Sequence, residues 1–129
     1  MTKSLGAAVR GITLGLILLA GLSGPAWAGM NEGIKAYRKG DFKGAYREWG
    51  ALAEKGHGGA QYLLGTLYEK DKGVKKDKAK ALVWYSKAAK GGLASAQYRM
   101  GQFNRLGRLV KRDYAKAMTW YDGCQAELQ

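Results

Sequence analysis

Residue types that commonly carry catalysis or bind metals are scarce in this sequence. His57 is the only histidine and Cys124 the only cysteine among 129 residues. A Ser–His–Asp triad would have to be built on His57, and nothing near it suggests a strained nucleophile. One histidine and one cysteine do not form a zinc site without carboxylates at ligand spacing, and no phosphate-binding G-x-x-x-x-G-K-[ST] motif occurs. We therefore expect no catalytic residues, no metal site and no cofactor.

These two side chains have plain structural interpretations. His57 lies in the glycine-rich run 56–59, which predicts a solvated loop. Cys124 follows Ala88 by 36 residues, and Ala88 falls on an apolar helical stripe, so Cys124 is expected to be a small core residue. A single cysteine excludes an intramolecular disulfide, and a reactive or intermolecular thiol is the alternative.

Positive charge recurs at a fixed interval along the chain. There are 22 basic and 10 acidic residues, which gives a net charge of +12. Such an excess favours anionic partners, for example an acidic polysaccharide, anionic lipid head groups or an acidic protein. The alternative is a solvated loop whose charge recurs because the unit containing it recurs. The basic residues at intervals of 36 are Lys39, Lys75 and Lys111; Lys76 and Arg112; and Lys72 and Arg108. We call these seven residues the basic ridge, since stacked units would align them along one edge.

An internal repeat of 36 residues must position these side chains. The segment AQYLLG at 60–65 matches AQYRMG at 96–101. The chain without its first 28 residues, which are discussed below, would hold about three such units. The first of them is degenerate in its first half. Further pairs at the same offset are Val74 and Val110, Asp77 and Asp113, Ala79 and Ala115, Ala81 and Ala117, Trp84 and Trp120, and Tyr85 and Tyr121.

Each unit has the pattern of two helices. Apolar residues recur at i, i+3, i+4 and i+7 in the segments that begin at Ala60 and at Ala81, which is the period of an amphipathic helix. Asp41, Asp77 and Asp113 each precede a second helix and are expected to cap its first turn. The sequence therefore predicts an all-α fold, a right-handed α-solenoid of about three helical hairpins that bury their stripes against one another.

Glycines mark both the ends of helices and the places where helices approach closely. Gly56 and Gly92 are expected to end second helices. Gly65 and Gly101 lie inside first helices, where a glycine costs about 1 kcal/mol relative to alanine, so their recurrence predicts close packing. The wider gaps are then expected to be filled by aromatic residues: Trp84, Tyr85, Trp120 and Tyr121.

The repeated motif resembles the Sel1-like repeat, a relative of the tetratricopeptide repeat. The residues that carry the resemblance are Ala60-Gln61, Leu64-Gly65, Tyr68, Gly73-Val74, Asp77, Lys80-Ala81, Trp84-Tyr85, Lys87-Ala88-Ala89 and Gly92. A full repeat spans 60–92, another spans 96–125, and 33–57 resembles the degenerate unit that often opens such arrays. The resemblance implies an adaptor or scaffold. A cysteine-rich secreted branch of the family is linked to penicillin-like molecules, but this chain lacks those cysteines.

The second full copy departs from the motif at its turn and in its first helix. Leu109 stands where the first copy has Gly73, which predicts a turn of different geometry. Arg99 and Asn104 replace a leucine and a tyrosine, which predicts a terminal unit with a more polar face.

A second candidate surface lies on the first helices of the units. On a helical wheel Tyr62 and Glu69, like Tyr98 and Arg105, point away from the apolar stripe. In tetratricopeptide relatives the first helices line a groove that holds peptides, and aromatic residues with arginine are typical of binding hot spots. The alternative is that these tyrosines pack between hairpins.

Residues 1–28 have the pattern of a secretory signal peptide. Lys3 and Arg10 precede an apolar run at 11–22, and Ala26-Trp27-Ala28 provides small residues at a cleavage site. Cleavage after Ala28 would leave a repeat domain, 29–129, in the periplasm or outside the cell. The alternative is an uncleaved inner-membrane anchor, although the apolar run is shorter than the about 20 residues that a span needs.

These features together favour a non-enzymatic adaptor that binds a protein partner in an envelope assembly. One alternative is a binder of acidic polysaccharide or anionic lipid head groups through the basic ridge. A cell-wall or β-lactam hydrolase is a further, disfavoured alternative. Nucleic acid is also disfavoured, because secretion would separate the chain from most of it and the lysines lack interleaved stacking aromatics.

Overall fold

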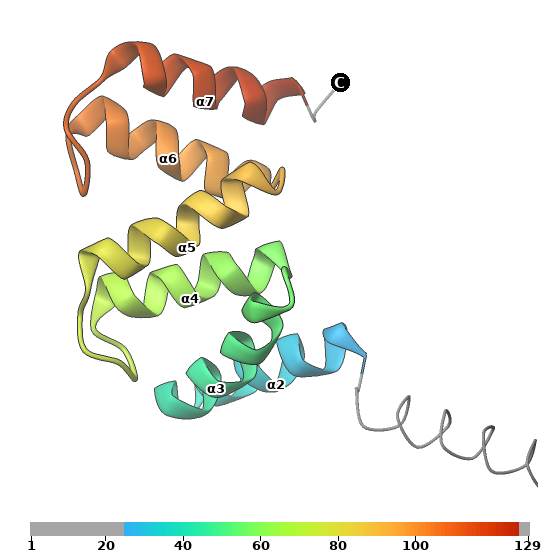
Figure 1. Ribbon diagram of the computed structural model, residues 1–129. Coiled ribbons are helices and arrows are strands. Elements are labelled where there is room, and N and C mark those ends of the chain that lie inside the picture. Colours follow the sequence, from blue (N-terminus) through green and yellow to red (C-terminus); the bar gives the residue numbers. More distant parts are fainter. Residues whose placement is uncertain (1–24, 127–129) are drawn as a thin grey trace, which may run out of the picture.

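The computed structural model describes residues 25–126, and this part of the chain consists of six α-helices joined by turns (Figure 1). Within it, neither a strand nor a cis peptide bond occurs. Each helix is 13 residues long. Their bounds are α2 Ala26–Arg38, α3 Phe42–Glu54, α4 Gly58–Lys70, α5 Lys78–Lys90, α6 Ala94–Leu106 and α7 Tyr114–Ala126.

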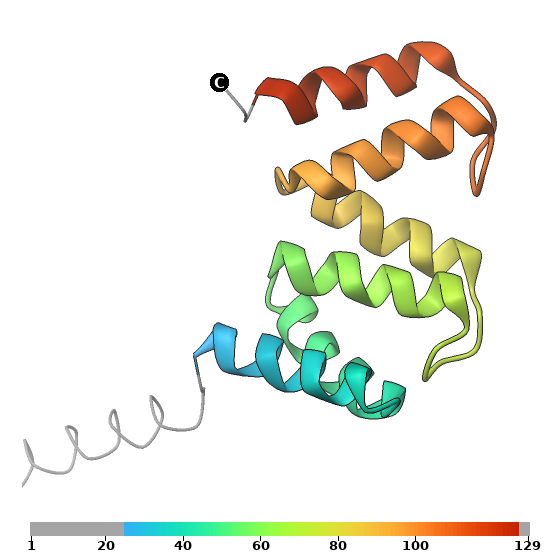
Figure 2. The same ribbon diagram turned by 180° about the vertical axis from the view of Figure 1, so that it is seen from behind.

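The helices pair in chain order into three hairpins, α2 with α3, α4 with α5 and α6 with α7. The hairpins stack, so that α3 packs on α4 and α5 packs on α6. Seen from behind, the turns within all three hairpins lie on the same side of the stack (Figure 2). The predicted all-α solenoid of three helical hairpins is therefore confirmed.

Aspartates begin all the second helices, as the sequence predicts. The Asp41 Oδ1 accepts a hydrogen bond from the Gly44 amide at 2.9 Å. Asp77 and Asp113 make the equivalent bonds, three residues ahead, at 3.0 and 2.9 Å. Each bond satisfies an amide that the helix itself leaves free, so these positions fix where α3, α5 and α7 begin.

The aromatic residues of the second helices pack on glycines of the first helices. A Cβ on Gly65 would lie 3.1 Å from the Tyr85 ring, and the ring is 1 % exposed. A Cβ on Gly33 would overlap the Trp49 indole, and one on Gly101 would overlap the Tyr121 ring. The close packing expected at Gly65 and Gly101 is confirmed, and Gly33 is a third site of the same kind.

Gly33 escaped the 36-residue pattern because the first hairpin has a shorter turn. The turn of the first hairpin is residues 39–41, whereas those of the next two are 71–77 and 107–113. The starts of α2 and α4 are therefore 58 − 26 = 32 residues apart, not 36. The four missing residues lie in the turn and not in a helix, so Gly33 occupies the same place in α2 as Gly65 does in α4. At this offset Gly33 aligns with Gly65. Gly29, Glu32 and Ala36 stand where the motif has Gln61, Leu64 and Tyr68, so the first half of this unit remains degenerate.

The turns of the two full repeats have the same geometry, so the different turn predicted at Leu109 is wrong. Asp71 and Gly107 have φ of 58° and 67°, and Gly73 and Leu109 have φ of 72° and 62°. Leu109 thus adopts a left-handed conformation that costs a residue with a side chain about 1–2 kcal/mol. Its side chain packs against the core, which offsets part of that cost.

The polar face predicted from Arg99 and Asn104 is also wrong. Asn104 is 4 % exposed and donates from Nδ2 to the Met100 carbonyl at 2.8 Å. The Arg99 guanidinium lies 5.1 Å from the Phe103 ring and pairs with Glu69. Both side chains thus lie within the packed structure and make hydrogen bonds there, although the Arg99 Nε is buried without a partner.

A glutamine joins each pair of neighbouring hairpins, and it is buried at Gln61 and half-buried at Gln97. Gln61 donates from Nε2 to the Ala53 carbonyl and Gln97 donates to the Ala89 carbonyl, both at 3.2 Å. In each case the glutamine lies in the first helix of one hairpin and the carbonyl near the end of the preceding helix. The recurring Ala-Gln pair of the motif is therefore an alanine that permits close approach and a glutamine that fixes it.

The predicted leader, 1–28, lies largely outside the described residues. The predicted cleavage point after Ala28 falls in the first turn of α2. No described helix has the length and apolar character that crossing a membrane requires.

Candidate partner-binding hollows

Two open hollows lie along the second helices of the stack. The N-terminal hollow, of about 480 Å³, is lined by α3, α4 and α5. The C-terminal hollow, of about 760 Å³, is lined by α5, α6, α7 and the turn between α6 and α7. In both, two second helices form the walls and the first helix between them contributes the floor.

The two hollows are built from equivalent positions of successive repeats. Seven lining positions of one recur in the other at an offset of 36 residues. The pairs are Tyr46 and Leu82, Gly50 and Ser86, Glu54 and Lys90, Leu64 and Met100, Tyr68 and Asn104, Lys80 and Lys116, and Trp84 and Trp120. The hollows are therefore a repeated feature of the fold with different chemistry in each copy.

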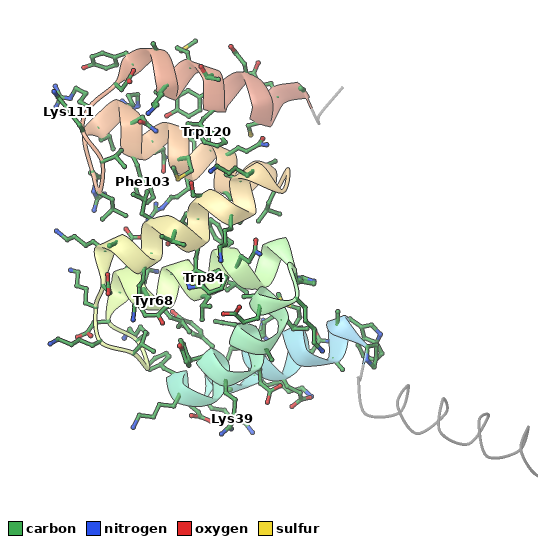
Figure 3. All side chains as sticks on the ribbon, viewed as in Figure 1. Lys39, Tyr68, Trp84, Phe103, Lys111 and Trp120 are labelled. Carbon is green, nitrogen blue, oxygen red and sulfur yellow. The ribbon has the colours of Figure 1, made fainter. Side chains whose placement is uncertain are left out.

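Trp84 and Trp120 occupy equivalent places, one repeat apart along the stack (Figure 3). Both are half-buried: one side packs against the core and the other lines a hollow. The prediction that they fill gaps is thus incomplete. In the second hairpin the fully buried aromatic residue is Tyr85, whereas Tyr121 in the last hairpin is half-buried. A half-exposed tryptophan that recurs on one face is the signal from which the hollows could have been found.

The N-terminal hollow carries a pair of hydrogen-bonded tyrosines. The hydroxyls of Tyr46 and Tyr68 are 3.0 Å apart and their rings meet edge to face. Burial, together with the hydrogen bond to Tyr46, raises the pKa of Tyr68 to about 12. Tyr68 therefore keeps its proton at physiological pH, and Lys80 lies 5.6 Å from the centroid of the Tyr68 ring. This hollow combines three aromatic side chains with three charged residues of mixed sign, Arg47, Glu54 and Lys80.

The C-terminal hollow is basic. Its lining includes Leu82, Met100, Val110 and Trp120 as apolar members. Four cations surround them, Lys90, Lys111, Arg112 and Lys116. The single carboxylate, Asp113, is already engaged in capping α7.

The structure distributes the basic ridge over several surroundings. Lys39 and Lys75 are exposed on the turns of their hairpins, and Lys39 and Lys111 lie toward opposite ends of the stack (Figure 3). Lys72 is half-buried, with Nζ 4.7 Å from the Phe42 ring, so it ties a turn to the preceding hairpin. The other four residues of the basic ridge divide between two sites. Lys76 and Arg108 lie in the same open hollow as Glu69, and Lys111 and Arg112 line the C-terminal hollow.

The four candidates on the first helices do not form one surface. The Tyr62 ring packs edge-on against Tyr85, with centroids 5.3 Å apart, and Glu69 is held in a hydrogen-bond network. Tyr98 is 51 % exposed and lies with Arg105 in a separate open hollow beside α7. The alternative for the tyrosines, packing between hairpins, is not what these contacts show. Tyr62 packs against Tyr85 of its own hairpin, and Tyr98 packs against Tyr121 of its own hairpin, with ring centroids 5.5 Å apart, while half of its surface stays exposed.

Comparison with known proteins places the chain in a family. The model of the Sel1 repeat matches residues 58–93 and 94–122, which together are about half of the chain. The chain belongs to the Sel1 repeat family. A comparison with curated proteins gives no match.

Solved structures show the same Sel1 architecture. A Sel1 repeat protein from Oxalobacter formigenes is 28% identical, with a TM-score of 0.75, over 88% of this chain and 90% of the other. The second is c5321, described as a protective antigen present in uropathogenic Escherichia coli strains and displaying an SLR fold. It is 37% identical, with a TM-score of 0.71, over 79% of this chain. The chain spans 22% of the length of c5321.

A charged network joins the two matched Sel1 repeats. Arg99 Nη2 donates to both oxygens of Glu69, at 3.0 and 2.9 Å, and the Tyr85 hydroxyl donates to Glu69 at 2.7 Å. Burial acts to raise the pKa of Glu69, but the hydrogen bonds from Tyr85 and Arg99 outweigh it and lower that pKa. Burial is also the main cause of the raised pKa of Tyr85, so the hydroxyl keeps its proton and remains a donor.

His57 and Cys124 each depart from the position that the sequence predicts for them. His57 is not a solvated loop residue: its Nδ1 accepts a hydrogen bond from the Ala60 amide at 3.2 Å and caps α4. Cys124 is only half-buried, although the equivalent Ala88 is fully buried, since no later helix in the described region covers it. Among residues 25–126, no three His, Cys, Asp or Glu side chains gather as metal ligands would.

Proposed function

We propose that this Sel1 repeat protein is a non-enzymatic adaptor of the cell envelope, exported to the periplasm or beyond. In this role it holds a partner protein along the hollows of its second helices. The family is a protein-interaction fold, and its Sel1 repeats supply a scaffold. The basic start, apolar run and Ala-Trp-Ala end of residues 1–28 support export. Retention by an uncleaved anchor would place the same repeats at the inner membrane.

The observation that carries this proposal is the recurrence of the hollows. Trp84 and Trp120 line them at equivalent positions, and partly exposed tryptophans of this kind are typical anchors for partner side chains. An extended partner segment that contacts both hollows would gain from two weak contacts acting together. Neither lining contains a histidine or a cysteine, which are common general bases and nucleophiles in enzyme sites.

Site-specific photo-crosslinking in cells tests the adaptor role. A photo-reactive amino acid at Val83, which is 51 % exposed in the N-terminal hollow, is expected to capture a defined protein recovered from the periplasmic fraction. The matched control is the same amino acid at Ala115, which is exposed but lies outside both hollows. Capture of nothing at Val83, or of the same set of proteins at both positions, would contradict the proposal.

A second candidate function is binding of an acidic polymer through the basic ridge. It is favoured by the exposure of Lys39, Lys75 and Lys111 on hairpin turns that share one side of the stack (Figure 2). Phosphate or carboxylate groups spaced along a polysaccharide or a lipid surface could contact several of these lysines at once. This function needs no hollow and no apolar contact.

Salt dependence and charge reversal distinguish this candidate. Binding to alginate or to vesicles containing an anionic phospholipid is expected to weaken steeply with added salt, because exposed charges are screened. Changing Lys39, Lys75 and Lys111 together to glutamate should weaken it about tenfold or more. The control changes Lys35, Lys55 and Lys87 to glutamate, with the same change in net charge. Equal losses from both triple variants would leave only non-specific attraction and exclude a ridge site.

A further inference from the structure

The C-terminal hollow differs from its N-terminal counterpart chiefly in charge. Glu54 in the N-terminal hollow is replaced by Lys90 at the equivalent position. The turn of the last hairpin adds Lys111 and Arg112 to the lining, whereas the equivalent Lys75 and Lys76 are not part of the N-terminal hollow. The C-terminal hollow is therefore strongly positive, whereas the equivalent N-terminal hollow is not.

The four cations of this hollow have no anionic partner within residues 25–126. The ion pairs of that region are Lys35 with Glu32 and Arg99 with Glu69, and neither involves the hollow. Asp113, the carboxylate in the lining, accepts a hydrogen bond from the Lys116 amide through Oδ1. With one carboxylate against four cations, the lining keeps an excess of positive charge, and an anionic ligand would reduce the repulsion among the cations.

Four apolar side chains, which we call the apolar floor, line the C-terminal hollow beside the buried Asn104. Met100 is 6 % exposed, and Val110, Leu82 and Trp120 are partly buried hydrophobic residues packed on the core. Removing their remaining exposed surface from water would favour a ligand with an apolar group. Ser86, at the wall, offers a hydroxyl that can donate to or accept from a peptide backbone.

We propose that the C-terminal hollow binds an acidic peptide segment, in which an apolar side chain is flanked by aspartates or glutamates. This inference rests on the proposed adaptor function and names the chemistry of its partner. The apolar side chain would lie against Trp120 and Met100, and the flanking carboxylates would face Lys90, Lys111 and Arg112. A uniformly charged polysaccharide would satisfy the cations but leave the apolar floor unused, so the peptide fits both features better.

Fluorescence anisotropy on the exported protein tests this proposal with a defined probe. The probe is a labelled peptide of sequence Glu-Asp-Leu-Phe-Glu-Asp, and it is expected to bind. A second peptide with the acids replaced by Gln and Asn, and a third with Leu-Phe replaced by Ser-Ser, are each expected to bind about tenfold more weakly or worse.

Single charge reversals locate the peptide on the protein. Lys90→Glu, which installs the residue of the N-terminal hollow, is expected to weaken binding by about tenfold or more. Lys55→Glu is the matched control, exposed and outside both hollows, and should change the affinity less than about twofold. Thermal unfolding of both variants shows whether the fold is intact, and Arg112→Glu provides a second reversal should Lys90→Glu fail to fold.

The possible failures separate this inference from the adaptor function. Equal weakening by Lys90→Glu and Lys55→Glu, or undiminished binding of the Ser-Ser peptide, would show attraction by net charge alone and overturn the inference. Absence of probe binding, with specific capture of a partner at Val83, would overturn the acidic-peptide site and leave the adaptor standing. Absence of both would overturn both.

Discussion

Changing Gly33 to alanine is expected to lower the free energy of unfolding by about 2–3 kcal/mol, although alanine is the better helix former. The new Cβ would overlap the indole of Trp49, which is 2 % exposed and belongs to the packed core. Displacing the indole also weakens the hydrogen bond from its Nε1 to the Met30 carbonyl, at 3.4 Å. Together these losses exceed the about 1 kcal/mol gained from replacing a helical glycine.

Gly50 provides a matched control on the neighbouring helix. It also lies inside a helix, but a Cβ there would meet nothing within 4 Å. Gly50→Ala is therefore expected to raise the free energy of unfolding by up to about 1 kcal/mol. Denaturant unfolding followed by circular dichroism measures both changes. If the two variants shift stability in the same direction, close packing at Gly33 is not what fixes the first hairpin.

A smaller aromatic residue tests whether the overlap is the cause. Trp49→Phe alone should destabilise the protein, because it removes buried apolar surface. In the double variant with Gly33→Ala, however, the smaller ring leaves room for the new methyl group. We expect the double variant to be more stable than the sum of the single changes implies. Additive losses would instead point to a change in α2 itself.

Local signals in the sequence were sufficient to predict the fold. The aspartate caps, the helix-ending glycines and the period of the apolar residues each act within one or two turns of chain, so their effect can be inferred without knowing the neighbours. The 36-residue repeat then fixed how the hairpins stack, because equivalent residues of a solenoid must have equivalent surroundings. The register of α2 was missed for a related reason: its turn is four residues shorter, and a fixed offset does not show a deletion.

The candidate sites depended on distances that the repeat does not encode. Trp84 and Tyr85 are adjacent in sequence, yet Tyr85 is buried and Trp84 lines a hollow. Successive side chains on a helix point about 100° apart, and the surrounding helices determine which of the two is covered. Glu69 and Arg99 are 30 residues apart, off the 36-residue offset, so aligning the repeats could not pair them. The hollows likewise exist only between hairpins, where no single helix predicts their width.

Changing Glu69 to glutamine is expected to lower the free energy of unfolding by about 2 kcal/mol at neutral pH. The Glu69 side chain is 15 % exposed and the Arg99 side chain 30 %, so the loss should be smaller than for a fully buried pair. Without the carboxylate, the guanidinium would stay packed on the rings of Phe103 and Tyr85 with its charge unpaired. Glu32→Gln removes an ion pair whose side chains are 65 and 58 % exposed, and it should cost less than about 0.5 kcal/mol.

The pH dependence of unfolding gives this prediction a sign. The pKa of Glu69 is lowered in the folded protein, so the folded state holds the carboxylate better than the unfolded state does. That stabilisation is complete above the ordinary pKa of a glutamate, about 4.3, and is lost as the pH falls through the lower folded value. The difference in stability between the wild-type protein and Glu69→Gln should therefore shrink between about pH 5 and pH 3. A difference that stays constant over this range would show that Glu69 contributes through its shape and packing, not through its charge.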